Sequence, residues 1–221
     1  MATAKKESAK KIEIDDSHII TLYMNDVLEN NHNTKNVYVF FKNNNIEESH
    51  FYSFFGSLDA IKQSIWSKFL DNAIDTLSKD VNYASYPDKN KLLSLYFTLF
   101  EILTLNRSFI VYTLVENKEG MKNLKDFKVF RSNFKEFVND MIQENESNGR
   151  LSNVTRPLFS EGAWIQFLFI LKFWIDDNSK SFEKTDILIE KSVNTIVDLL
   201  DIKRVDNLLD FGKFLWKEKM M

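Results

Sequence analysis

The sequence predicts an all-α protein, and three observations support this fold class. The chain has 221 residues, 44% of them hydrophobic, which is enough to bury a sizeable core. Its five glycines and two prolines are few, because these residue types together usually make up roughly 12% of a chain. Apolar residues also recur every three or four positions along much of the sequence, which is the period of a helix. A sandwich or barrel, with a turn every 8–12 residues or so, does not fit this pattern.

The N-terminal part of the chain predicts a flexible arm followed by short helices. Residues 1–16 carry four lysines and little that could pack, so we expect a flexible basic arm. One helix is predicted from Ile19, and a second one from an N-cap at Thr34. Within the second, the run VYVFF favours a strand by propensity, but no second β-rich run lies nearby to pair with it. A short aromatic segment at residues 46–56 completes this part.

Longer helices are predicted in the rest of the chain. Ser57 is the expected N-cap of a helix that runs to about residue 78, and Pro87 marks the next break. Further helices are predicted at residues 91–105, 107–117, 124–141, 160–174, 182–201 and 205–220. The first of these is apolar on nearly every side, which predicts a buried helix, and residues 143–153 are expected to form a polar loop. We therefore expect a head at residues 17–66, a connector helix to about residue 80, and a body at residues 81–221.

The residue types that usually carry catalysis or bind metals are absent or scattered. The chain has no cysteine, which excludes disulfides, cysteine-bound zinc and a thiol nucleophile. The three histidines, His18, His32 and His50, do not have the spacing of a metal site. All five glycines are isolated, so there is no glycine-rich phosphate-binding loop. We expect no enzymatic activity, no cofactor and no metal.

No segment reads as a membrane span or a secretory signal. The most apolar stretch, residues 163–175, contains Gln166 and Lys172. Its 13 residues are fewer than the roughly 20 that a spanning helix needs. The first residues are polar and lysine-rich with no apolar run behind them, unlike a signal peptide. We expect a cytoplasmic protein.

The segment from Asn45 to Ile61 carries a resemblance to a known family. It reads Asn-Ile-Glu, three further residues, Phe-Tyr, one residue, Phe-Phe, then Gly-Ser-Leu-Asp-Ala-Ile. It resembles the third helix of the tetracycline-repressor (TetR) family of bacterial regulators. There the pattern is Gly-Val-Ser, three variable residues, Leu/Phe-Tyr, one residue, Tyr/His-Phe, and a link to Lys-Glu/Asp-x-Leu. The resemblance implies a three-helix helix-turn-helix head, and behind it a helical body for ligand binding and dimerisation.

The resemblance also implies a function and its residues. It implies a DNA-binding homodimer that occupies an operator and responds to a small apolar effector. The DNA-binding residues would be Lys35, Ser49, His50, Tyr52 and Lys62. The ligand pocket would be lined by Phe97, Phe100, Phe127, Phe130, Phe134, Phe167 and Phe173. The dimer interface would contain Trp164, Phe169, Ile189 and Ile196. Phenylalanines at helical spacing can equally be plain core, and the aromatic helix can equally be the centre of a monomer.

The head departs from the family pattern in ways that bear on DNA binding. Asn45 replaces the turn glycine, Glu47 next to Glu48 replaces the capping serine, and Leu58 replaces a lysine that contacts phosphate in the family. Residues 17–66 contain three lysines and five acidic residues, a net charge of −2. Because DNA affinity comes largely from basic side chains that neutralise phosphates, an acidic head is expected to bind DNA weakly. Only the four lysines of the arm partly offset this.

A second resemblance lies near the C-terminus and leaves an alternative open. The sequence Phe-Trp-Ile-Asp-Asp-Asn-Ser from Phe173, followed by Phe182 and Thr185-Asp186, is similar to part of the mitochondrial coenzyme-Q biosynthesis lipid-binding family. That family has the TetR fold, has lost DNA binding and holds an isoprenoid lipid. The alternative function is therefore a TetR-fold protein that binds a lipid or another hydrophobic ligand and has lost DNA binding.

Overall fold

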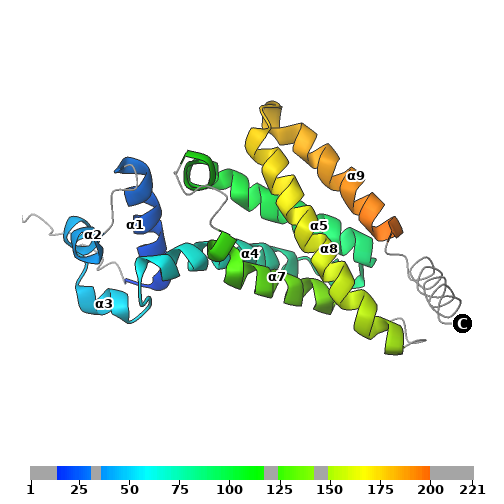
Figure 1. Ribbon diagram of the computed structural model, residues 1–221, viewed down its shortest axis with the longest axis horizontal. Coiled ribbons are helices and arrows are strands. Elements are labelled where there is room, and N and C mark those ends of the chain that lie inside the picture. The colour runs from blue at the N-terminus through cyan, green and yellow to red at the C-terminus, as the bar shows by residue number, and fades with distance from the viewer. Residues whose placement is uncertain (1–13, 31–35, 117–123, 142–148, 200–221) are drawn as a thin grey trace, which may run out of the picture. The chain divides into compact units, whose positions relative to one another are not determined.

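The computed structural model describes residues 14–30, 36–116, 124–141 and 149–199 (Figure 1). These residues form nine α-helices with short 3-10 and π segments, and no strand occurs among them. The predicted all-α class is therefore confirmed. Contacts divide the chain into two compact units that meet within one helix, between Lys62 and Gln63. The expected limits of head, connector and body stay predictions. The basic arm and the expected last helix, residues 205–220, lie outside the described residues, apart from Ile14 to Asp16.

The first unit contains α1 (Asp16–Glu29), α2 (Val37–Asn44), α3 (Glu48–Tyr52) and the start of α4 (Leu58–Ser78). Each of the first two helices begins at a side-chain cap. The Asp15 carboxylate accepts from the His18 amide at 2.7 Å, and Asn36 Oδ1 accepts from the Tyr38 amide at 2.9 Å. The helix predicted over VYVFF is confirmed, but its N-cap is Asn36 and not Thr34. The predicted cap at Ser57 is confirmed, because its hydroxyl accepts from the Ala60 amide at 3.2 Å.

The turn between α2 and α3 depends on Asn45. This residue has φ 53° and ψ 39°, the left-handed conformation that ends many helices. The next amide, that of Ile46, donates to the Phe41 carbonyl at 3.1 Å, and the Ile46 side chain is buried. Asn is among the few side chains that tolerate this conformation, which explains how it stands in for the family's glycine.

Aromatic rings hold the first unit together. Phe41 on α2 contacts Phe51 on α3 with ring centroids 4.8 Å apart, and Tyr23 on α1 contacts Phe40 on α2 at 6.1 Å. Phe40 and Phe51 are completely buried. The helical period places Phe40 and Phe41 inward together, while the β propensity of the same run is overridden by this packing.

The second unit contains the rest of α4, then α5 (Asp88–Leu105), α6 (Arg107–Val111), a π segment (Tyr112–Glu116), α7 (Lys128–Met141), α8 (Gly149–Asp176) and α9 (Glu183–Leu199). Helix α8 packs along both α7 and α9, and α9 packs on α5 (Figure 1). Two expectations were wrong. Helix α8 begins at Gly149 instead of Ser160 and so takes in part of the expected loop. Helix α5 is not buried all round, because Leu105 is 80% exposed.

Helix α8 is the centre of this unit. By length and composition alone, its residues Arg156–Asp176 could cross a membrane. The expectation that the apolar stretch is too short to span, which rested on residues 163–175, was therefore wrong. Within this stretch, 56% of the most apolar 18 residues are buried inside the protein. Contact with α7 on one flank and α9 on the other is the environment of a core helix. Core helices can be as long and as apolar as helices that span membranes.

Arg107 and Asp177 fix the corner between α8 and α9. The Arg107 guanidinium donates to the carbonyls of Trp174 at 2.9 Å and Ile175 at 3.0 Å, which are free at the end of α8. It lies 4.5 Å from the Trp174 ring centroid and 4.7 Å from that of Phe182. Phe182 has φ 60°, a costly conformation for a bulky side chain that these contacts help to hold.

The Asp177 carboxylate ties the corner to the first turn of α9. One of its oxygens accepts from the Ser179 amide at 2.8 Å and hydroxyl at 2.7 Å. The other accepts from the Thr185 amide at 3.0 Å and hydroxyl at 2.7 Å. Burial favours the neutral acid, but these four bonds outweigh it and lower the pKa of Asp177 to about 2.

We predict that Asp177→Asn lowers the free energy of unfolding at pH 7 by about 2 kcal/mol, since an unfolded Asp has a pKa of roughly 3.9. A depressed folded-state pKa stabilises the protein above about pH 4, and this contribution disappears as the pH falls through 2. Denaturant unfolding of both proteins between pH 7 and pH 2 measures the difference. Asp176→Asn is the control: its exposed pair with Lys172 should contribute less than about 1 kcal/mol. A loss for Asp177→Asn that stays equally large at pH 2 would contradict this account.

Candidate functional site

The predicted DNA-binding residues are found mainly on the short helix α3. Ser49, His50 and Tyr52 are all exposed there, and Tyr52 is 54% exposed. They share this surface because Phe51 between them is turned into the core. Lys62 lies on α4 and donates to Asp59 at 3.0 Å. Lys35 lies outside the described residues.

The surface around α3 is acidic and partly apolar. Glu47 and Glu48 are exposed at the start of α3, where the helix dipole favours carboxylates but a DNA phosphate would meet like charge. Three large side chains are also exposed nearby in sequence: Tyr38 at 61%, Val39 at 45% and Phe54 at 45%. None of them was among the predicted site residues. Each lies close to a buried phenylalanine in a helical pattern, and that position could have indicated that its own side chain faces outward.

The seven predicted pocket residues fall into two groups. Four of them, Phe127, Phe130, Phe134 and Phe167, are buried and pack ring to ring, with Phe130 and Phe167 centroids 5.0 Å apart. Trp164 stacks on Phe167 at 5.4 Å, and Trp66 of α4 lies 4.4 Å from Phe127. These rings form an aromatic core.

The other three predicted pocket residues line two hollows; Phe100 is buried, whereas Phe97 and Phe173 are partly exposed. Phe97 and Phe100 line a hollow of about 260 Å³ together with Trp174 and Phe182. Phe173, 38% exposed, lines another hollow of about 490 Å³ at the C-terminal end of α8.

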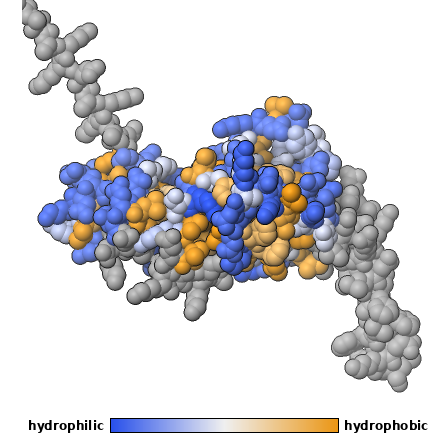
Figure 2. All heavy atoms as spheres, turned by 90° about the horizontal axis from the view of Figure 1, so that it is seen from above, coloured by the Kyte–Doolittle hydropathy of each residue, from blue (hydrophilic) through white to orange (hydrophobic). Residues whose placement is uncertain are grey.

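The four predicted interface residues are likewise divided. Trp164 and Ile189 lie in the protomer's own core, and Ile196 is half-buried. Phe169 is 57% exposed and belongs to a row of apolar residues along the outer side of α8, with Leu158 and Ile165. Figure 2 shows apolar residues, in orange, at the surface of the protein among hydrophilic ones.

A groove of about 680 Å³ runs between α7 and α8. Three cationic residues of α7 line it, and their spacing of three and four positions places them along one stripe. Apolar side chains line it too: Trp164 and Leu168 of α8, and the predicted Phe127 from the 3-10 segment Leu124–Phe127 before α7. The lining residues are Phe127, Lys128, Arg131, Ser132, Lys135, Glu136, Asn139, Asp140, Trp164 and Leu168.

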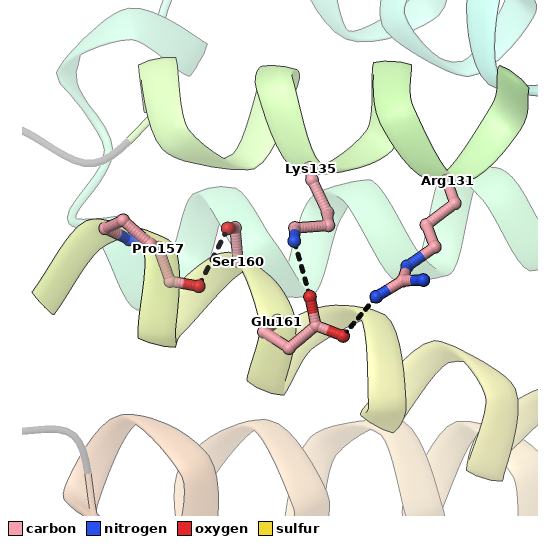
Figure 3. A network of polar contacts seen from close by, with 5 residues as sticks. All are labelled: Arg131, Lys135, Pro157, Ser160 and Glu161. Atoms are coloured by element: carbon pink, nitrogen blue, oxygen red, sulfur yellow. Dashed lines mark hydrogen bonds and ion pairs between the residues drawn. The ribbon is translucent and has the colours of Figure 1, made fainter. Parts of the chain in front are cut away.

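One carboxylate of α8 joins two of these cations (Figure 3). Arg131 Nη2 donates to Glu161 Oε1 at 2.6 Å, and Lys135 Nζ donates to Glu161 Oε2. The Lys135 bond, with help from Arg131, lowers the pKa of Glu161 despite desolvation, so the carboxylate is ionised at neutral pH. The Arg131 guanidinium also lies 5.9 Å from the Trp164 ring centroid. Figure 3 shows Ser160 beside this network, where its hydroxyl donates to the Pro157 carbonyl at 3.1 Å.

This network was not predicted from the sequence. Its signal was the pair Arg131 and Lys135, four residues apart on the polar side of an amphipathic helix. Such a side is usually solvated, and the partner carboxylate comes from a helix that was expected to begin only at Ser160, next to Glu161. In the described part of the chain, no group of three acidic or histidine side chains is placed to hold a metal ion.

We predict that Phe134→Ala lowers the free energy of unfolding by about 3–5 kcal/mol, because it removes a completely buried ring from the aromatic core. Phe97→Ala, at a position 39% exposed, should cost about 1 kcal/mol. Denaturant unfolding of the two variants measures the difference. Equal losses would show that Phe134 does not stand in a tightly packed core.

Comparison with known proteins supplies the family. The family model described as "Tetracyclin repressor-like, C-terminal domain" matches residues 91–215, which is more than half of the chain and includes most of α5 and all of α6 to α9. A search of curated proteins found no match, and neither did a search of solved structures. The resemblance to the coenzyme-Q family remains a resemblance: its residues Trp174, Asp177 and Thr185 are explained by the corner that they build. With an all-α fold and this domain over most of its second unit, the chain belongs to the TetR family.

Proposed function

We propose that this protein is a TetR-like transcriptional regulator: a cytoplasmic homodimer whose head binds DNA and whose body binds a small, largely apolar effector. The observation that carries the proposal is the α2–Asn45–α3 arrangement, a helix-turn-helix in a chain that also has the family's C-terminal domain. The two heads of such a dimer would have one arrangement that binds DNA and another that does not. An effector can regulate the protein only if it binds these two arrangements with different affinities.

Side chains on α3 supply the polar groups for DNA contact. The Ser49 hydroxyl, the His50 imidazole and the Tyr52 hydroxyl are exposed and can reach phosphates or base edges. Glu47 and Glu48 can accept from cytosine amino groups in the major groove. Sequence preference would then come from α3, while lysines of the N-terminal arm would supply much of the attraction to the backbone.

A second candidate function is favoured by the acidic surface of the head. Glu47 and Glu48 start α3, and Lys62 is already engaged by Asp59. Both features reduce the positive potential that phosphates require. The second candidate is therefore a TetR-fold protein that binds a hydrophobic ligand and does not bind DNA.

A salt-titrated binding assay on the DNA upstream of the protein's own gene separates the two candidates. For a regulator we expect a specific complex at 50 mM salt that weakens strongly towards 200 mM. His50→Ala with Tyr52→Ala should weaken it about tenfold or more, whereas Glu101→Gln, an exposed change on α5, should not. If neither a specific nor a non-specific complex forms at low salt, the regulator proposal fails and the second candidate stands.

The homodimer is proposed on the exposed row of α8. Leu158, Ile165 and Phe169 recur at seven and four positions, so they share one side of the helix and form an exposed apolar strip on the described part of the chain. Pairing this strip with that of a second copy buries it symmetrically, as a twofold dimer requires.

We predict that Phe169→Glu releases monomers, because a carboxylate on the paired strip would be buried without a partner. Sedimentation velocity of the whole chain measures the change. Leu105→Glu is the matched control, because Leu105 is a large exposed apolar residue outside α8 and its change should leave the dimer intact. An unchanged sedimentation coefficient for Phe169→Glu would reject this interface.

A further inference from the structure

The groove between α7 and α8 has a cationic side. Lys128, Arg131 and Lys135 lie along one stripe of α7, and Arg131 and Lys135 point to α8 (Figure 3). Glu136 and Asp140 also line the groove, but the helical period places them on the flank of α7 away from Arg131. The positive charge of the groove is therefore concentrated where α7 faces Glu161.

The carboxylate of Glu161 is bound to two of these cations, and another carboxylate could replace it. Its side chain is 33% exposed, and its carboxylate accepts from both Arg131 and Lys135. Ion pairs at such exposure contribute little net stability, because solvent screens them and ordering the side chains costs entropy. A carboxylate from another molecule could therefore take the same two donors at a small cost to the fold.

Apolar groups lie directly beside the cations. Trp164, Phe127 and Leu168 line the same groove, and the Trp164 ring lies beneath the Arg131 guanidinium. At about 680 Å³ the groove falls within the size range of sites for small molecules. Asn139 also lines it, and its buried Oδ1 has no hydrogen-bond donor in the described part of the chain. A ligand here would meet a cationic pair and an aromatic floor.

We infer that the ligand of the body is an amphipathic anion. Its carboxylate replaces that of Glu161 between Arg131 and Lys135, and its apolar part lies on Trp164 and Leu168. The inference rests on the proposed ligand-binding role of the body and is independent of whether the head binds DNA. It narrows a small apolar effector to one with a single negative head group, such as a medium-chain fatty acid or an aromatic carboxylic acid.

Isothermal titration of the whole chain with decanoate, and with decan-1-ol as the neutral probe of equal length, tests this inference. We expect decanoate to bind at least tenfold more tightly than decan-1-ol, because two charge-assisted bonds hold its head group. Arg131→Met with Lys135→Met should abolish that preference. Lys180→Met, which removes an exposed cation outside the groove, should leave it unchanged.

The affinity of Glu161→Gln for decanoate distinguishes a ligand site from an ion pair that only stabilises the fold. Removing the competing charge while keeping the shape should tighten decanoate binding about threefold to tenfold, and should not tighten decan-1-ol. Equal binding of both probes, or decanoate binding that Glu161→Gln leaves unchanged or weakens, would overturn the inference while the apolar effector still stands. If neither probe binds, the groove is not a ligand site. The regulator proposal is tested separately, by the DNA-binding assay.

Discussion

The second unit depends on the burial of one face of α8. Trp164, Phe167 and Trp174 of this helix are buried, and their rings contact aromatic residues of α5 and α7. Each buried aromatic ring removes a large apolar area from water, and ring contacts of this geometry add to that. The Arg107 and Asp177 contacts then set where α8 ends and α9 begins, so the remaining helices are placed relative to this one.

Close packing around α8 decides where a ligand can lie. Phe130, Phe134 and Phe167, which were expected to line a ligand pocket, pack against one another, whereas the groove lined by Arg131 and Lys135 lies at the rim of this core. A site at the rim can combine an aromatic floor with charged groups that remain hydrated. This combination is unavailable in a dry interior, where an unpaired charge is costly.

Much of the fold followed from local patterns. The helical period placed most of the helices, and Asn45 with the aromatic run after it indicated the turn between α2 and α3. The start of α8 was missed because Gly149 and Pro157 are poor helix residues, yet the helix continues through both. Periodicity marks phenylalanines as buried but cannot distinguish a packed ring from one that lines a hollow. The Glu161 network was missed because it joins residues that are 30 and 26 positions apart in the chain.

The central claim is that ligand space lies at the rim of a packed aromatic core and is controlled by Glu161. A crystal structure of the protein grown with decanoate tests it most directly. The account predicts a carboxylate within hydrogen-bond distance of Arg131 and Lys135, with Glu161 turned out of that position and the Phe130–Phe167 contact unchanged. Decanoate enclosed between Phe130, Phe134 and Phe167, with Glu161 still paired to both cations, would contradict it.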